Sequence, residues 1–341
     1  GDKQVVLEAV ERSGAAVRWA AEELRGDAEV MLRAARADRQ ALSFAAPRLL
    51  GSPEFVAAAV REDGMALQFA AESMKRDRTI VLAAVQQSGL ALEFASKELS
   101  NDGEVVLMAF EQAGREPLRL AGERLRGDRS FWLQAVKIDG LSLEFATPTV
   151  QGDRDVVIAA AEQAVDALAY AAEELRRDTQ VLLAAVRKGS GALRFAAEGL
   201  LGSREFMLAA VEEDSEALEY AADALRQDPA FMGAPAVVLA QMGREAALEV
   251  VAQDGHKLKG LREALRGDRE VVLAAARSVG PQVLGLAAEG LRRDGELARE
   301  VLREGVALGA APAALFQQLP RELQGDSDFV LQAVQEHAGL L

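Results

Sequence analysis

Few residues in this chain have the types and spacing that enzymes use for chemistry. The 341-residue sequence contains no cysteine, which excludes disulfides, thiol nucleophiles and zinc–thiolate sites. Its two histidines, His256 and His337, lie far apart in the chain and at different positions of the pattern described below. They therefore predict neither a metal cluster nor a catalytic triad.

Two other motifs have a type and spacing that could carry chemistry or recognition. Carboxylate pairs such as Glu22-Glu23 could act as general acid and base, and Arg-Gly-Asp occurs at 25–27, 126–128 and 266–268. Both recur at fixed positions of a repeat, and a pair repeated along a chain has no single pocket that would raise one pKa. We interpret the carboxylates as a solvated helix face and the tripeptides as turns between helices.

The element that positions these motifs is a repeat of 25 residues. Each repeat starts at an anchor residue, usually Asp, that follows a turn rich in Arg and Gly; one repeat has 26 residues, and the phase breaks once and then resumes. The anchors are Asp2, Asp27, Ser52, Asp77, Asp102, Asp128, Asp153, Asp178, Ser203, Asp228, Gly243, Asp268, Asp294 and Asp326. Twelve anchors start full repeats, and those at Asp228 and Asp326 start half repeats.

Each full repeat predicts two amphipathic helices joined by a turn. In residues 77–101 the first helix carries the apolar run around Ala84, and Asp77 can cap its free N–H groups. A glycine twelve residues after the anchor, here Gly89, is expected to end the first helix in a left-handed conformation. The second helix has apolar residues at three- and four-residue intervals, as in Leu92 and Leu99.

Two columns of residues indicate how the repeats pack. Alanine recurs in the first helix, and a small residue there lets neighbouring backbones approach closely. An aromatic residue recurs in the second helix, at Trp19, Phe44, Phe69, Phe94, Phe145, Tyr170, Phe195 and Tyr220, and is expected to form wedges of a continuous core. Helices of about nine residues are not stable alone in water, so each repeat must bury its apolar stripe against the next. The pattern predicts an all-α solenoid and leaves the handedness of its superhelix open.

This hairpin, with its halves Asp-x-x-Val-Val-Leu-x-Ala-Val and Ala-Leu-x-Phe-Ala-Ala-x-x-Leu-Arg, resembles the repeat of domain-of-unknown-function family 4116. The resemblance extends over almost the whole chain. It implies an array of helical repeats of the kind common in algae and other protists, and it implies no active site.

The regular pattern divides the chain into 1–227, a half repeat or kink at 228–242, and divergent repeats at 243–341 with an insertion near 305–320. Pro235 stands in the alanine column, where proline would break or kink a helix. Both irregular segments are open to two interpretations, drift that bends the superhelix or faces that dock a partner. The second interpretation, together with an aromatic pair in one first helix, gives the candidate partner contacts Trp132, Pro229, Pro235, Leu308, Pro312 and Phe316. For Trp132 a core or groove-lining role is the alternative.

Charge and hydropathy exclude some classes of function. The net charge of −15 and the pI near 4.8 disfavour nucleic acid, because phosphate binding needs clustered Lys and Arg. No apolar run is long enough to span a membrane. The chain starts in phase with the repeat and without Met, so we expect it to be a processed product or part of a longer polypeptide.

The sequence therefore leads us to expect no enzyme, no cofactor and no metal, but a scaffold or linker subunit that binds protein partners in a larger assembly. The resemblance to algal and protist arrays makes a photosynthetic or respiratory complex of an organelle an expected host. Two alternatives are a module that binds a peptide or small ligand in its concave groove and, less favoured by the charge, a nucleic-acid-binding repeat. The partner and the oligomeric state are not determined by the sequence.

Overall fold

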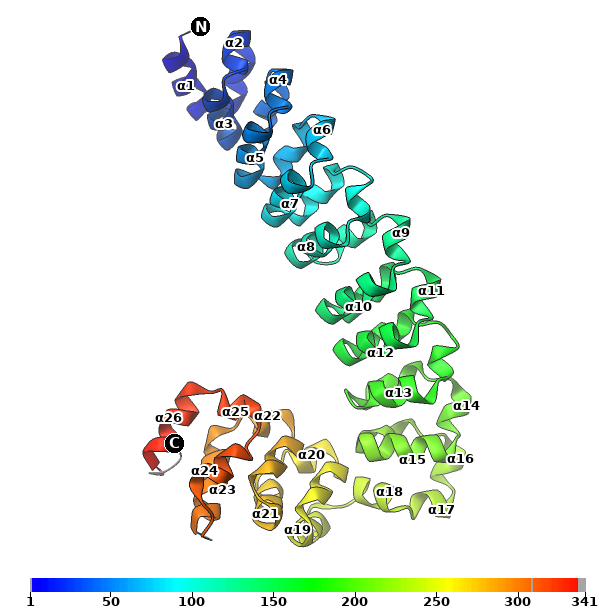
Figure 1. The fold of residues 1–341 in the computed structure, drawn as a ribbon. Helices are drawn as coiled ribbons and strands as arrows, with labels where there is room; N and C mark the ends of the chain where they lie inside the picture. The colour runs from blue at the N-terminus through cyan, green and yellow to red at the C-terminus, as the bar shows by residue number, and fades with distance from the viewer. Residues whose placement is uncertain (1, 308, 337–341) are drawn as a thin grey trace. The chain divides into compact units, whose positions relative to one another are not determined.

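Figure 1 shows the chain as a computed structural model, in which residues 2–307 and 309–336 are described. All regular elements of these residues are helical and follow one another as tandem repeats, so the predicted all-α solenoid of repeats is confirmed. The chain divides into two compact units, residues 1–172 and 173–341. This boundary does not coincide with the segments 1–227, 228–242 and 243–341, which follow the phase of the repeat.

A full repeat contains three helical pieces where the sequence predicted two. The first, here called the A helix, is usually ten residues long; a 3₁₀ helix and a short helix of about one turn follow it. The expected single second helix is wrong because extended residues interrupt it. In the repeat 77–101 the chain is extended at Ala95, and the N–H of Ser96 bonds to the carbonyl of Lys75 in the preceding repeat at 2.9 Å. This hydrogen bond between repeats thus takes the place of the one that the same N–H would make inside a continuous helix.

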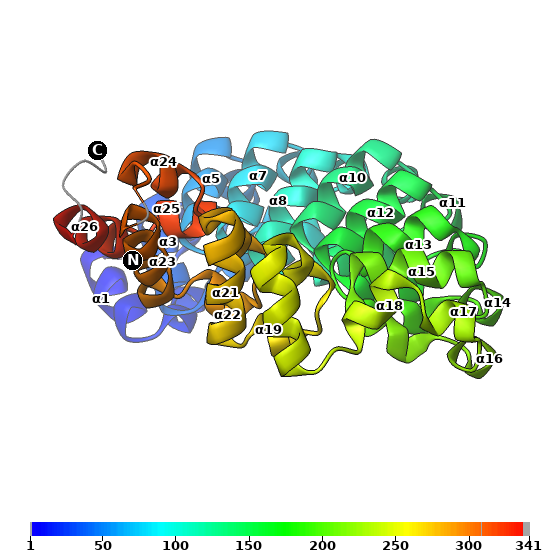
Figure 2. The same cartoon turned by 90° about the horizontal axis from the view of Figure 1, so that it is seen from below.

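The N-terminal unit contains seven A helices in sequence, and Figure 2 shows α5, α7, α8, α10 and α12 in one row. These A helices are α1 (Lys3–Arg12), α3 (Ala28–Ala37), α5 (Pro53–Glu62), α7 (Arg78–Gln87), α8 (Gly103–Ala113), α10 (Arg129–Ile138) and α12 (Arg154–Gln163). The 3₁₀ helices are η1 (Gly14–Trp19), η2 (Arg39–Phe44), η3 (Gly64–Phe69), η4 (Gly89–Phe94), η6 (Glu116–Leu120), η7 (Gly140–Phe145) and η8 (Val165–Tyr170). The short helices are α2 (Glu22–Arg25), α4 (Pro47–Leu50), α6 (Glu72–Lys75), η5 (Leu99–Asn101), α9 (Glu123–Arg126) and α11 (Pro148–Gln151).

The C-terminal unit begins with the short helix η9 (Leu175–Arg177). Its A helices are α13 (Thr179–Val186), α15 (Arg204–Glu213), α19 (Arg244–Gln253), α21 (Arg269–Val279), α23 (Gly295–Ala307) and α26 (Ser327–Glu336). Its 3₁₀ helices are η10 (Ser190–Phe195), η11 (Ser215–Tyr220), η12 (Gly255–Gly260) and η13 (Pro281–Leu286). The remaining pieces are α14 (Glu198–Leu201), α16 (Asp223–Arg226), α17 (Pro229–Met232), α18 (Pro235–Ala240), α20 (Glu263–Arg266), α22 (Glu289–Arg292), α24 (Pro312–Gln317) and α25 (Arg321–Gln324).

The anchor residues cap the A helices as predicted. The Asp77 carboxylate accepts hydrogen bonds from the backbone N–H groups of Thr79 and Ile80, at 2.9 and 3.2 Å. Asp27, Asp102, Asp128, Asp153, Asp178, Asp268 and Asp294 accept from their own first turns in the same way. Each cap satisfies backbone donors that have no partner inside the helix, which is how such short helices begin at a defined residue.

The glycine after the A helix has a different role from the predicted left-handed cap. Among the glycines expected in the left-handed conformation, only Gly114 and Gly280 have a positive φ. Each of these two ends an A helix of 11 residues. The others open a 3₁₀ helix and lie against the alanine column of the next repeat. A Cβ on Gly14 would lie 2.4 Å from the Ala34 carbonyl oxygen, far inside van der Waals contact. The glycine is therefore needed for close approach between repeats.

This approach sets how closely successive A helices pack. Successive A helices pack most closely where glycine opens the 3₁₀ helix between them. These pairs are α1/α3, α5/α7, α7/α8, α10/α12 and α19/α21. The pairs α3/α5, α8/α10, α13/α15 and α21/α23 are looser, and Arg39, Glu116, Ser190 and Pro281 open their 3₁₀ helices. The predicted alanine column is buried, with Ala34, Ala84, Ala109 and Ala275 fully inaccessible.

The aromatic column is not the core wedge that the sequence predicted. Its rings are half-buried on the 3₁₀ helices, except for Trp19, which is 81% exposed. The core side chains of these 3₁₀ helices are instead the residues two positions earlier, such as Leu42, Leu67 and Leu92, which are almost completely buried. The 3₁₀ geometry, with three residues per turn, accounts for this difference because it turns the aromatic toward the edge of the packed layer.

Both irregular segments lie in the C-terminal unit. In residues 228–242 the A helix is broken into α17 and α18, with Pro235 at the first position of α18, as expected of a proline in the alanine column. In the long repeat α23 extends to Ala307 and the α-helix α24 replaces the 3₁₀ helix. Thus the insertion lengthens one helix and rebuilds the next.

Candidate interaction surface

A ladder of ion pairs joins neighbouring repeats on the side where the A helices begin. The residue after the anchor is Lys or Arg in many repeats, and its side chain reaches the anchor of the next repeat and the acidic residue two positions beyond. Arg78 donates to Asp102 at 2.7 Å and also to Glu104. The corresponding donors are Lys3, Arg129 and Arg244, which pair with Asp27, Asp153 and Asp268. Each of these anchors therefore caps its own helix and binds the preceding repeat.

These contacts shift the ionisation of the anchors. The hydrogen bond from Arg78, with those from the backbone of Val105 and Glu104, holds the pKa of Asp102 below its ordinary value despite partial burial. Lys3 lowers the pKa of Asp27 in the same way, and Arg244 lowers that of Asp268. The ion-pair ladder therefore favours the charged form of the anchor carboxylates. The sequence pattern did not reveal these ion pairs because the partners lie a whole repeat apart.

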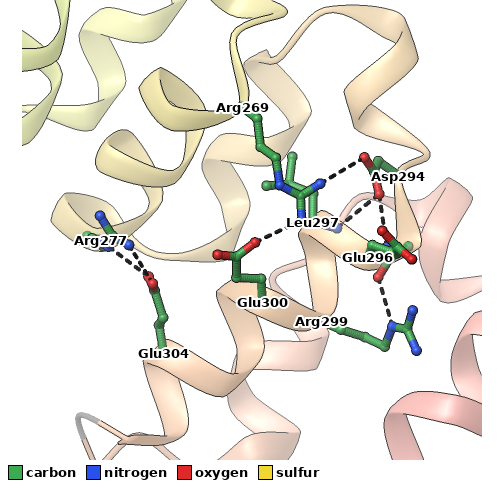
Figure 3. A network of polar contacts seen from close by, with 9 residues as sticks. Arg269, Arg277, Asp294, Glu296, Leu297, Arg299, Glu300 and Glu304 are labelled. Carbon is green, nitrogen blue, oxygen red and sulfur yellow. Dashed lines mark hydrogen bonds and ion pairs between the residues drawn. The ribbon is translucent and has the colours of Figure 1, made fainter.

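Figure 3 shows the variant of this ladder at the long repeat. Arg269 reaches Asp294 at 3.3 Å and also Glu300 at 2.8 Å, because the sixth residue of α23 is acidic. Arg277 binds both carboxylate oxygens of Glu304, at 2.9 and 2.6 Å. These side chains are between 27% and 57% exposed, so these pairs orient α21 and α23 but contribute little stability individually.

The aromatic rings of the N-terminal unit form a surface that we call the aromatic stripe, in which Trp19 is exposed and the others are half-buried: Trp19, Phe44, Phe69, Phe94, Phe145 and Tyr170. They lie on 3₁₀ helices that pack side by side, η1 on η2, η3 on η4 and η7 on η8. The Arg18 guanidinium lies 4.7 Å from the Trp19 ring centroid and 5.9 Å from that of Phe44, and Arg119 lies 5.5 Å from that of Phe145. The stripe combines aromatic faces with cations, as protein interfaces do.

A groove of about 450 Å³ lies between α8 and α10, where the repeat of 26 residues separates the A helices. Leu107, Met108 and Phe131 supply apolar surface, and the carboxylates of Glu104, Glu111 and Asp128 outnumber the one cation of its lining, Arg124. The groove could hold an apolar side chain with a positive charge.

The structure places Trp132 in the core and not on a contact surface. Its ring is fully buried, its indole N–H donates to the Arg126 carbonyl at 2.8 Å, and it meets Phe131 edge to face. The neighbouring Phe131, also buried, is the one of the pair that lines the groove. The interpretation as a partner contact is therefore replaced by the core alternative, because the hydrogen bond and burial satisfy the whole side chain.

The other candidate contacts are not gathered into one site. Pro229 and Pro235 are exposed at the first positions of α17 and α18. Pro312 and Phe316 are half-buried on α24, and the Phe316 ring stacks on Phe329 with centroids 6.3 Å apart. Leu308 lies outside the described residues.

The motifs that could do chemistry are structural where the structure describes them. In the first Arg-Gly-Asp, Gly26 ends α2 and Asp27 caps α3. His256 is exposed near the start of η12, and His337 lies outside the described residues. Within residues 2–307 and 309–336 no cluster of His, Asp and Glu could hold a metal ion. Over the same residues, no helix combines the length and apolar character that a membrane crossing requires.

The comparison with protein families agrees with the resemblance of this hairpin to family 4116. The model of the family described as Domain of unknown function (DUF4116) matches four times, at residues 2–50, 52–100, 77–126 and 102–151. The first six repeats thus match this family in tandem. Comparisons with curated proteins and with solved structures gave no match.

Proposed function

We propose that this protein is a non-enzymatic scaffold whose stacked repeats hold protein partners within a larger assembly. The aromatic stripe is the observation that carries the proposal. Aromatic residues and arginine are enriched in the centres of protein interfaces, and here half-buried rings recur on successive 3₁₀ helices with guanidinium groups beside them. A regularly repeated surface suits an extended partner better than a single small substrate.

The stripe is tested with a matched pair of double variants. In Phe69→Ser with Phe94→Ser the stripe loses two adjacent rings, whereas Gln68→Ser with Glu93→Ser changes the preceding residues on the same 3₁₀ helices. Tagged chains are purified under native conditions from the organism of origin, and stoichiometric partners are identified by native mass spectrometry. We expect a partner with wild type and control and its loss with the ring variant. A monodisperse wild-type chain without partners contradicts the proposal.

The cellular location belongs to the same proposal. The resemblance to algal and protist arrays favours an assembly inside a plastid or mitochondrion. Fractionation followed by quantitative mass spectrometry should find the chain in organelle complexes, and recovery in the cytosol alone would contradict this part.

The groove between α8 and α10 favours a second candidate function, the binding of a basic peptide or small cation. Its carboxylates Glu104, Glu111 and Asp128 surround apolar side chains. A fluorescent peptide of alternating Arg and Leu should bind, with an affinity that falls as salt is added because surface ion pairs are screened. The variant Glu104→Gln with Glu111→Gln should weaken this binding, and an unchanged affinity would exclude the groove.

A further inference from the structure

A hydrogen-bond ladder between backbones links the short helices of successive repeats. The N–H six residues before one anchor donates to the carbonyl two residues before the preceding anchor. In nine junctions these bonds measure between 2.8 and 3.3 Å, for example 2.9 Å from Ala46 to Arg25 and 3.0 Å from Ala222 to Leu201. The donor is the residue that precedes the short helix, and the acceptor is at the end of the short helix before it.

The half repeat 228–242 interrupts this ladder. It has α17 and α18 but no short helix, and α18 packs against both η11 and η12, the 3₁₀ helices of the flanking repeats. Thus α18, the second piece of the broken A helix, lies between the 3₁₀ helices of the flanking repeats, and this half repeat has no short helix of its own between α18 and α19. The flanking repeats meet beside it, where the Ser215 hydroxyl donates to the Leu261 carbonyl at 3.1 Å.

Two backbone groups lose their ladder partner at this place. By position, the Arg226 carbonyl would accept from the missing segment and the Arg262 N–H would donate to it. Neither makes a backbone hydrogen bond of the ladder within the described residues. The ladder groups of the flanking repeats are paired, at 3.0 Å from Ala222 to Leu201 and from Ala288 to Arg266.

A pocket of about 330 Å³ opens at the same place. Leu218, Met232 and Ala240 supply its apolar surface, and Glu216, Arg226 and Arg262 supply charges of both signs. The charged side chains have neighbours of their own: Arg226 pairs with Asp223 at 3.4 Å, and Arg262 donates to the Met242 carbonyl at 3.3 Å. Burial, with the nearby charges of Asp214 and Glu263, raises the pKa of Glu216, so this wall is less readily charged than an open surface.

We propose that this pocket binds one helical turn of a partner protein, of the form small-x-x-Leu, which completes the interrupted backbone ladder. The occupant is argued from the chain itself, because the same place in the other repeats is filled by segments of this form. Examples are Ala21 with Leu24, Ala46 with Leu49, Ala197 with Leu200 and Ala222 with Leu225. The inference rests on the proposed scaffold function and names a site and a partner chemistry for it.

The geometry assigns a role to each part of the bound turn. The N–H of the small residue donates to the Arg226 carbonyl, and a carbonyl at the end of the turn accepts from the Arg262 N–H. The leucine side chain packs on Leu218, Met232 and Ala240. A small residue is expected at the start because the donor residues of the nine paired junctions are all Ala, Ser, Thr or Gly.

The probe is a fluorescent synthetic peptide with the sequence of residues 215–227, Ser-Glu-Ala-Leu-Glu-Tyr-Ala-Ala-Asp-Ala-Leu-Arg-Gln, which contains a short helix of this form. Binding to the full chain is measured by fluorescence anisotropy. A second peptide carries an N-methyl group on the residue that corresponds to Ala222, so only the ladder N–H is removed. A third has aspartate in place of the leucine that corresponds to Leu225.

The matched protein variants are Arg262→Pro and Arg262→Ala. Both remove the guanidinium, but only proline removes the backbone donor, and the φ of −56° at Arg262 is compatible with proline. Pro320 already occupies the equivalent position, before α25. Equal urea midpoints for the two variants show that the fold is unaffected.

We expect saturable binding of the first peptide to the wild type and to Arg262→Ala. Binding should be about tenfold weaker with the N-methyl peptide and with Arg262→Pro, as for the loss of one hydrogen bond. Absence of saturable binding, or equal affinities across these pairs, overturns the inference. The scaffold proposal has its own test, because it requires that partners are lost with the ring variant. If partners bind through the aromatic stripe and still bind the Arg262→Pro variant, only the pocket proposal is overturned.

Discussion

At the scale of single residues, the glycine that opens each 3₁₀ helix explains the spacing of the repeats. Its sequence context, after the last turn of an A helix, equally suits a left-handed cap, so the pattern alone did not distinguish the two roles. The distances do. A Cβ on Gly255 would lie 2.3 Å from the Ala275 carbonyl oxygen and 2.7 Å from a methyl of Val279. Glycine and the buried alanine of the next repeat form one contact.

Gly255→Ala should therefore destabilise the C-terminal unit. The added methyl must push against a backbone carbonyl, and such overpacking typically costs about 1–3 kcal/mol. We expect a lower urea midpoint, measured by circular dichroism. Gly290→Ala is the matched control because its Cβ would meet nothing within 4 Å in α22, and alanine favours helix. A Gly255→Ala midpoint equal to that of the control would show that the repeats do not need this contact.

The ion-pair ladder predicts a dependence of stability on pH. Because Arg78 lowers the pKa of Asp102 in the folded state, the contribution to stability is present above the ordinary aspartate pKa, near 4. It is lost as the pH falls through the lower pKa of the folded state. Arg78→Gln should thus be less stable than wild type at pH 7, and the difference should diminish in acid.

Thermal unfolding between pH 7 and pH 2 measures this difference. Arg61→Gln is the control, since Arg61 is an exposed arginine of the same unit outside the ladder. A difference between Arg78→Gln and wild type that persists unchanged at pH 2 would assign the effect to packing of the arginine stem rather than to its charge.

At the scale of elements, the sequence predicted those features that depend only on residues close together in the same helix. The A helices, their caps at Asp27 or Asp77 and the buried alanine column follow from local propensity and period, and the structure has them. The split of the second helix could not be predicted, because the N–H of a residue such as Ser96 finds its partner in another repeat. For the same reason the aromatics were misplaced: α and 3₁₀ helices turn the same residue toward different sides.

The backbone ladder makes a prediction at this scale. Ala222→Pro removes the donor to the Leu201 carbonyl at 3.0 Å, although its φ of −58° suits proline. Leaving a partner unsatisfied costs about 1–3 kcal/mol. Arg262→Pro changes the equivalent position where the N–H has no ladder partner, so it should cost clearly less. The urea midpoints of the two variants test this difference. Equal decreases in midpoint would mean that the backbone ladder contributes no stability.

At the scale of the molecule, the groove and the pocket are products of irregularities in the array, whereas the aromatic stripe follows its regular repeats. The wide groove follows from one added residue after α8, and the pocket at α18 follows from the missing half of a repeat. The sequence located both irregular segments of the C-terminal unit but selected residues there by type, such as Pro229 and Pro235. The groups that matter for the pocket are backbone atoms of Arg226 and Arg262, which no pattern of side chains reveals.

A chain in which each repeat packs on its neighbours should tolerate the loss of a whole repeat. Deletion of residues 52–76 joins Gly51 to Asp77 and restores the junction of turn and anchor seen at Gly26 and Asp27. We expect the same helical content per residue and a smaller urea dependence of the unfolding free energy, because less surface is buried. Deletion of residues 52–63 alone removes α5 but keeps its 3₁₀ and short helices, whose buried residues Leu67 and Met74 then lack their own A helix. This shorter deletion should be the more destabilising of the two. If the order were reversed, the repeat of 25 residues would not be the unit of packing.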